Sequence, residues 1–159
     1  MALETDTPAP DFELVNQFGE HIRLSDFRGI KPVALVFFPL AFSGNCSTEL
    51  CDLRDNLAIF EHDNVELIAV SVDSKATLRA FAESERHTFT LLADFWPHGA
   101  VANQYGVFLG DKGYANRATF LIDTRGIIRS SVVTSPGERR SLDQYRAAIA
   151  ELAVFTAQL

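Results

Sequence analysis

A continuous apolar run that ends at a proline, with a cysteine seven positions later, constrains this sequence more than any other feature. Residues 33–38 read Val-Ala-Leu-Val-Phe-Phe, and this β-branched and aromatic composition predicts a strand buried on both faces of a sheet. Pro39 ends the strand, because a proline has no amide hydrogen to donate to a neighbouring strand. The chain must therefore leave the sheet and turn between Pro39 and Cys46.

A helix is predicted directly after this turn. The apolar residues of the segment recur in steps of three and four, at Leu50, Leu53, Leu57 and Phe60. This spacing predicts an amphipathic helix over residues 47–61 that packs its apolar side on the sheet. Asn45 is a suitable N-cap for it, which would place Cys46 in the first turn.

A cysteine in the first turn of a helix has unusual chemistry. The unpaired amides of that turn and the helix dipole both favour a thiolate over a thiol. The cysteine pKa can then fall from about 8.5 into a range of roughly 3.5 to 7.5. We therefore interpret Cys46 as a reactive nucleophile, against the alternative that it is a small buried hydrophobic residue, the commonest role of a free cysteine.

Two further residues of the turn suit a reaction centre. Ser43 has a hydroxyl that can donate and accept a hydrogen bond three positions before Cys46. Pro39 would fix the backbone and shield the site from water. Each of them alone is also compatible with ordinary turn chemistry, so the prediction depends on their combination around Cys46.

The pattern Pro39-x-x-x-Ser43-x-x-Cys46 resembles the active-site signature of the peroxiredoxins. The wider pattern, over residues 37–46 and 94–101, is similar to the E-type alkyl hydroperoxide reductases and covers nearly the whole chain. The resemblance implies a thioredoxin-like α/β fold. The order of predicted elements indicates the same architecture, a central mixed β-sheet flanked by helices with an N-terminal β-hairpin.

The resemblance also implies roles for three residues outside the turn. Arg117 matches the family's active-site arginine, whose guanidinium would stabilise the thiolate and the charge on the departing peroxide oxygen. Glu49 matches a polar position that helps to orient the arginine, although a solvent-facing helix carboxylate is equally compatible with the sequence. Trp96 either lies near the cysteine pocket, where its fluorescence would report the redox state, or is buried in the core.

The 159 residues, of which 47% are hydrophobic, suit one compact domain over residues 1–159. The remaining predicted elements are a hairpin in 11–24, a helical turn at 25–29, strands at 65–72 and 89–93, helices at 75–85 (capped by Ser74) and 97–105, a glycine-rich loop at 106–116, a hairpin of 118–122 with 127–133, and a final helix with a Ser141–Gln144 capping box.

Composition and motifs exclude several classes of function. A net charge of −7 with scattered Lys and Arg argues against nucleic acid and anionic membranes as partners. The four histidines are dispersed and lack a second cysteine pair, which argues against a metal site. The sequence has no phosphate loop or dinucleotide fingerprint, so we expect no cofactor. We see neither a signal peptide nor a membrane span and expect a cytoplasmic protein.

Cys51 departs from the E-type pattern, which usually has a single cysteine. The spacing Cys46-x-x-x-x-Cys51 instead resembles that of the Q-type, or bacterioferritin comigratory protein, peroxiredoxins, in which the second cysteine resolves the first. Five residues of α-helix separate two Cα atoms by roughly 8.6 Å, whereas a disulfide needs less than about 7 Å. Resolution would therefore require unwinding of the helix. The alternative is a buried helix residue, with an outside thiol as resolving group.

These observations predict a thiol peroxidase that reduces hydrogen peroxide or organic hydroperoxides. Cys46 would form a sulfenic acid, Cys51 would condense with it to a disulfide, and thioredoxin, a glutaredoxin-like protein or a low-molecular-weight thiol would return the enzyme to its reduced form. The resemblance implies a homodimer. The alternatives are a thiol-disulfide reductase or redox-sensing protein on the same fold, against which the missing Cys-x-x-Cys pair argues, and a thiol-free scaffold or chaperone.

Overall fold

In the residues that the structure describes, a seven-stranded mixed sheet forms the centre of the fold. The computed structural model describes residues 2–136, 138 and 140–157, and for residues 45–48 and 153–157 it describes the backbone only. The strand order is β2-β1-β5-β4-β3-β8-β9. The strands are β1 Glu13–Asn16, β2 His21–Arg23, β3 Val33–Phe37, β4 Glu66–Ser71, β5 Thr90–Ala93, β8 Arg117–Ile122 and β9 Ile128–Thr134.

The register of the sheet brings the ends of five strands to one edge. Strands β3, β4 and β5 are parallel to one another, so their carboxyl ends lie together. Strand β8 is antiparallel to β3 with Ala118 opposite Phe37, and its first residue, Arg117, pairs with Thr134 at the end of β9. We call this side of the sheet the carboxyl edge. It is the side where the chain leaves β3 toward Cys46.

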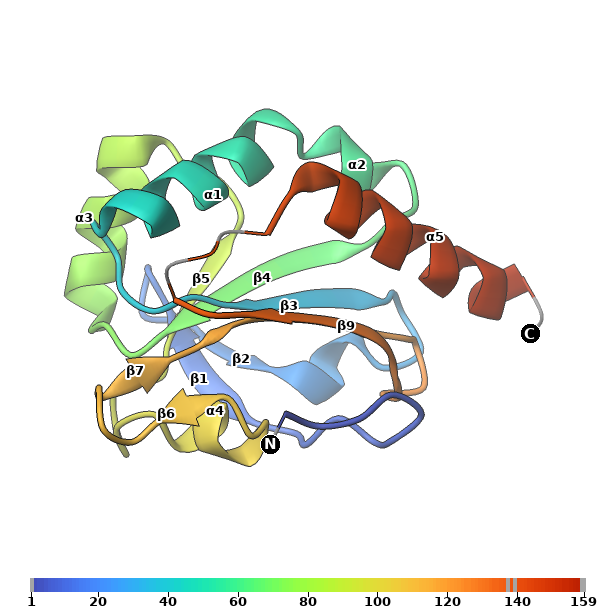
Figure 1. The fold of residues 1–159 in the computed structure, drawn as a ribbon, viewed down its shortest axis with the longest axis horizontal. Helices are drawn as coiled ribbons and strands as arrows, with labels where there is room; N and C mark the ends of the chain where they lie inside the picture. The colour runs from blue at the N-terminus through green and yellow to red at the C-terminus, as the bar shows by residue number, and fades with distance from the viewer. Residues whose placement is uncertain (1, 137, 139, 158–159) are drawn as a thin grey trace.

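Helices cover both faces of the sheet, as Figure 1 shows. On one face lie α1 Gly44–Asp55, α2 Ala58–Glu61, α3 Lys75–Glu85 and α5 Leu142–Ala157, and on the other lie α4 Ala100–Gln104 and the single turn η1 Leu24–Phe27. Strand β3 faces both layers with every side chain at most 2% exposed. The prediction of a strand buried on both faces is confirmed. Among the described residues, no helix combines the length and apolar character that crossing a bilayer requires.

The helix that contains the cysteines starts and ends earlier than predicted. Its N-cap is Ser43, with extended backbone angles, and not Asn45, whose side chain lies outside the described part. The predicted single helix over 47–61 is two helices, because Asn56 leaves helical geometry after α1 and its side-chain amide donates to the Asp52 carbonyl at 2.8 Å. Cys46 is nevertheless the third residue of α1, so its predicted place in the first turn is confirmed.

Two predictions for residues 97–116 are wrong in detail. Helix α4 begins at Ala100 and not at Pro97, because the buried Asp94 carboxylate accepts hydrogen bonds from the amides of Val101 (3.1 Å) and Ala102 (2.9 Å) and thereby caps it. The loop over 106–116 contains a small hairpin, β6 Phe108–Leu109 with β7 Tyr114–Ala115. The other predicted elements, including the Ser74 cap and the Ser141–Gln144 capping box, are confirmed.

His87, just after α3, is a buried histidine in an aromatic setting. Its ring centroid lies 5.0 Å from those of Phe81 and Phe89, and neither ring nitrogen has a hydrogen-bond partner among the described residues. Burial, assisted by the charge of Arg54, lowers the pKa of His87 from 6.5 to about 4. The folded protein therefore holds this side chain in its neutral form.

This burial predicts a loss of stability in weak acid. Between pH 6.5 and 4 the unfolded chain binds a proton at His87 that the folded chain does not, so the free energy of unfolding is fully present above about pH 6.5 and falls as the pH falls. We expect a loss of about 2 kcal/mol between pH 7 and pH 5, measured by urea unfolding, which His87→Phe should largely remove. His62→Gln, at an exposed histidine, is the control. Equal losses in wild type and His87→Phe would contradict the assignment.

Candidate functional site

The turn between β3 and α1 is held in place by Asp73. The amide of Phe38 donates to the Val70 carbonyl (3.0 Å) and continues the pairing with β4 by one residue. The carboxylate of Asp73, just after β4, then accepts hydrogen bonds from the Ala41 amide (2.8 Å) and the Ser71 hydroxyl (2.6 Å). The turn is therefore tied to the carboxyl edge before α1 begins.

Within the turn, Pro39 and Ser43 lie where the sequence predicts them. Pro39 is buried at the end of β3. The Ser43 hydroxyl donates to the Leu40 carbonyl at 2.8 Å, which leaves its oxygen lone pairs available to accept a hydrogen bond. Phe42, between them, has a φ of 64°. This left-handed conformation is uncommon for a bulky residue and often occurs at functional sites.

Cys46 lies in the first helical turn of α1, directly after the loop that connects β3 to this helix. Its side chain lies outside the described part of the chain. The position of its backbone is enough to place the residue at the positive end of a 12-residue helix, at the carboxyl edge.

One turn further along α1, Glu49 is buried between two arginines. Its carboxylate forms a bidentate ion pair with Arg140, in which Nε donates to Oε1 and Nη2 donates to Oε2. The backbone amide of Arg140 also donates to Oε1. The second arginine is Arg117, with Nη1 3.6 Å from Glu49 Oε2. All three side chains are at most 1% exposed. The solvent-facing alternative for Glu49 is therefore wrong.

Arg117 is fixed at the same edge by the main chain. It is the first residue of β8, one position from Ala118, which pairs with Phe37 at the end of β3. Its Nε donates to the Pro136 carbonyl at 2.7 Å. The guanidinium thus connects the start of β8 to Glu49 on α1 and to the segment after β9.

The charges of this group favour an anion nearby. Glu49, Arg117 and Arg140 together carry one net positive charge in a setting almost without solvent, where electrostatic interactions are strong. The first turn of α1 adds the partial positive charge of its amides. A thiolate at this helix start would complement both.

Arg140 is a member of the site that the sequence analysis does not predict. Besides Glu49, it donates to the Phe37 carbonyl (3.0 Å) and the Thr119 hydroxyl (2.8 Å), so it connects β3, β8 and α1. Its separation from Glu49 is 91 positions. Arg140 directly follows Arg139 and precedes the Ser141 capping box, and this local sequence gives no signal of a contact with a residue so far away along the chain.

Trp96 does not belong to this buried group. Its side chain is 81% exposed, so the core alternative is wrong. It lines a groove of about 550 Å³ together with Leu14 and Val15 of β1 and Lys75 at the start of α3. The residue follows β5, which is two strands away from β3 at the carboxyl edge.

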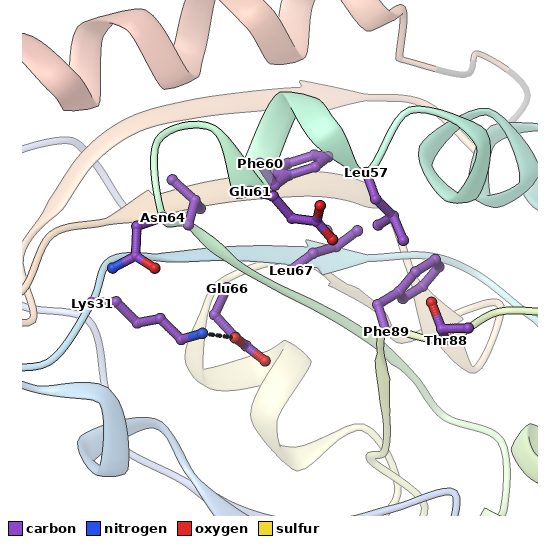
Figure 2. A pocket seen from close by; sticks show the side chains of 10 residues that line it. Lys31, Leu57, Phe60, Glu61, Asn64, Glu66, Leu67, Thr88 and Phe89 are labelled. Atoms are coloured by element: carbon purple, nitrogen blue, oxygen red, sulfur yellow. Dashed lines mark ion pairs between the residues drawn. The ribbon is translucent and has the colours of Figure 1, made fainter.

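A second cavity lies at the opposite end of the strands. It has a volume of about 290 Å³ and lies beneath Phe60 and Leu57, beside the ion pair of Lys31 with Glu66 (Figure 2). Glu66 is the first residue of β4, so the cavity is remote from the carboxyl edge. Among the described side chains, no three His, Cys, Asp or Glu residues gather closely enough to hold a metal ion.

Cys51 lies on α1 but faces away from the arginines. It is partly buried, and its Sγ–H donates to Glu85 Oε2 at 3.4 Å. Burial and this hydrogen bond raise the pKa of the Cys51 thiol. Cys46 and Cys51 belong to one continuous helix, so in this state the helix keeps them too far apart for a disulfide.

Comparison with known proteins agrees with this geometry. Residues 5–131 match the model of the AhpC/TSA family. The chain belongs to that family. Alkyl hydroperoxide reductase E of Mycobacterium tuberculosis is 47% identical over 150 residues, which cover 94% of this chain and 98% of the relative. Peroxiredoxin tpx1 of Schizosaccharomyces pombe is 36% identical over 154 residues, covering 91% of this chain and 79% of the relative.

Solved structures give the same result. The crystal structure of peroxidoxin BcpB from Mycobacterium tuberculosis superposes with a TM-score of 0.83 at 33% identity, covering 96% of this chain and 97% of that one. The predicted thioredoxin-like α/β fold is confirmed, and so is the resemblance to E-type enzymes with features of the bacterioferritin comigratory proteins. This member of the AhpC/TSA family is a peroxiredoxin, a thiol-dependent peroxidase.

The buried ion pair predicts a large effect of removing Arg140. In Arg140→Met, the Glu49 carboxylate loses its bidentate partner while remaining buried. Breaking a buried pair in this way costs about 3–5 kcal/mol of unfolding free energy, measurable by urea denaturation. Arg146→Met is the matched control, since Arg146 is 54% exposed and pairs with Asp143 on the surface, where such a pair contributes at most about 1 kcal/mol. Similar losses in both variants would contradict the proposed arrangement.

Proposed function

We propose that Cys46 is the peroxidatic cysteine of this peroxidase. The observation that carries the proposal is the buried group of Glu49, Arg117 and Arg140 directly beside the helix turn that bears Cys46. A cation-rich, desolvated setting at a helix start favours the thiolate, which is the nucleophilic form of cysteine.

In the proposed reaction, the Cys46 thiolate attacks the terminal oxygen of hydrogen peroxide or an organic hydroperoxide. A sulfur–oxygen bond forms, the oxygen–oxygen bond breaks, and the departing oxygen takes a proton to leave as water or alcohol. Ser43, whose proton is donated to the Leu40 carbonyl, accepts a hydrogen bond from the peroxide, and Arg117 stabilises the charge on the departing oxygen. Pro39, buried at the end of β3, limits access of water. Glu49 and Arg140 position Arg117 and the helix.

Cys51 is proposed to resolve the Cys46 sulfenic acid as an intramolecular disulfide. The spacing Cys46-x-x-x-x-Cys51, which resembles that of the Q-type enzymes, supports this, provided that the first turn of α1 unwinds. A dithiol protein such as thioredoxin then reduces the disulfide, in preference to a glutaredoxin-like protein or small thiol, which would suit a lone sulfenic acid. Residues 1–159 act as a single domain in the cytoplasm.

A homodimer is proposed through the exposed apolar side chains around the start of α3. Phe95 and Trp96 are 52% and 81% exposed, beside a groove that includes Lys75. Leu40 and Phe42 belong to the turn that Asp73 holds and are also exposed. Covering such side chains with a second copy would remove apolar surface from water.

The role of Cys46 is tested by comparing the two cysteines. Cys46→Ser is expected to abolish peroxide consumption, because a serine hydroxyl is not ionised at neutral pH. Cys51→Ser is expected to reduce one equivalent of peroxide at the wild-type rate and then to stop or recycle slowly with a thioredoxin donor. Stopped-flow measurement of peroxide distinguishes the two. Undiminished consumption by Cys46→Ser would overturn the proposal.

The role of Cys51 is tested by the mass of the protein after one equivalent of peroxide. Wild type is expected to lose two hydrogens and to yield a peptide in which Cys46 is bonded to Cys51. Cys51→Ser should instead gain one oxygen at Cys46 and react with a sulfenic acid probe. A wild-type protein that carries an oxygen on Cys46 and never forms the bond would show that an outside thiol is the resolving group.

A further inference from the structure

Two residues on one side of α1 hold the last residue of α3. Cys51 and Arg54 are three positions apart and therefore lie on the same face of the helix. The thiol of Cys51 donates to the Glu85 side chain at 3.4 Å, and the Arg54 guanidinium donates to the Glu85 backbone carbonyl. Contacts to both the side chain and the backbone of Glu85 thereby hold its carboxylate against the Cys51 thiol.

This contact is placed to survive the unwinding that a disulfide requires. Leu50 and Leu53 are fully buried and anchor this part of α1 to the core. Glu49 is held by Arg117 and Arg140. These anchors allow unwinding to be limited to the turn before Glu49, which carries Cys46. In the resolving step Cys46 moves toward a Cys51 that stays against Glu85.

The charges around Cys51 keep it as a thiol. The charged groups that act on the thiol are Arg54 and Asp55 on α1 and Glu85 at the end of α3. The neutral His87 interacts with the same three groups. Burial is the main cause that raises the pKa of Cys51, the hydrogen bond and charge of Glu85 add to it, and Arg54 opposes it. A thiol is a poor nucleophile, so its attack on another sulfur needs a proton acceptor.

We propose that Glu85 is that acceptor: its carboxylate takes the proton from Cys51 Sγ as this sulfur attacks the sulfenic acid of Cys46. The proposal rests on the proposed function and adds a catalytic residue to its second step. Nothing in the local sequence marks Glu85, which becomes visible only because the end of α3 meets α1.

The step balances without any further reactant. A sulfur–sulfur bond forms between Cys51 and Cys46, and the sulfur–oxygen bond of the sulfenic acid breaks. Cys51 sulfur is oxidised and Cys46 sulfur is reduced. The hydroxide that leaves Cys46 combines with the proton carried by Glu85 and departs as water, which returns Glu85 to its carboxylate form.

The proposal is tested with Glu85→Gln, which keeps the size and a hydrogen-bond acceptor for Cys51 but removes the base. After one equivalent of peroxide, samples are quenched over time and analysed by mass spectrometry. We expect oxygen transfer to Cys46 at the wild-type rate and disulfide formation slowed at least about tenfold. Glu83→Gln is the matched control, since Glu83 is an exposed carboxylate on the same helix that pairs with Arg79. It should form the disulfide like wild type.

Whether Glu85→Gln slows or accelerates disulfide formation distinguishes a proton acceptor from a charge that only shifts the pKa of Cys51. Glu85 raises the pKa of Cys51, so removing its charge lowers that pKa, increases the thiolate and by itself would accelerate the step. A slower step in Glu85→Gln therefore reports the lost proton acceptor. The rate of disulfide formation in Glu85→Gln should also rise about tenfold per pH unit below the thiol pKa, as expected for attack by free thiolate. In wild type the same rate should depend on pH much less.

The remaining outcomes are distinct. An unchanged or faster disulfide step in Glu85→Gln overturns the proposal. A step slowed by the same factor at every pH also overturns it, because that result assigns Glu85 a structural role. Urea unfolding and circular dichroism confirm that the variant is folded. If wild type forms no sulfenic acid on Cys46, the proposed function fails instead, and if wild type forms the acid but no disulfide, the role of Cys51 fails.

Discussion

The arrangement of the carboxyl edge depends on one buried carboxylate between two arginines. Glu49 connects α1 to Arg117 at the start of β8 and to Arg140 ahead of α5, and Arg140 also binds the end of β3 through the Phe37 carbonyl. Three buried charges are costly to desolvate, and they are stable only when each has well-placed partners. The same network that fixes the first turns of α1 therefore also gives that end of the helix its net positive charge.

Placing both cysteines on α1 imposes opposite demands on one helix. The intact first turn supports the thiolate form of Cys46, whereas a disulfide with Cys51 requires that turn to open. Glu49 reconciles the two requirements, because its ion pairs hold α1 in place from that residue onward and leave the first turn outside them. Opening can then be limited to a single turn, and the buried Leu50 and Leu53 need not leave the core.

Local patterns in the sequence predict most of the fold and one half of the site. The apolar run before Pro39, the Ser74 cap and the stripe of the final helix are local signals, and the structure confirms them. The structure departs from the prediction at the break of the cysteine helix, where the Asn56 amide donates to the Asp52 carbonyl. It also departs at the start of α4, where the Asp94 carboxylate accepts hydrogen bonds from two backbone amides. Arg140 and Glu85 could not be predicted, because strand register and helix packing bring them to residues far away in sequence.

The order of the two proposed oxidation events follows from the contrast between the two sides of α1. The side toward Arg117 and Arg140 is net positive and favours a thiolate, whereas Cys51 faces the Glu85 carboxylate and its burial keeps the thiol protonated. Peroxide therefore meets only one ionised sulfur. Once Cys46 has become an uncharged sulfenic acid, the arginines no longer stabilise a thiolate, so the first turn loses part of what favours its helical form. The chemical product of the first step thus promotes the opening that the second step requires.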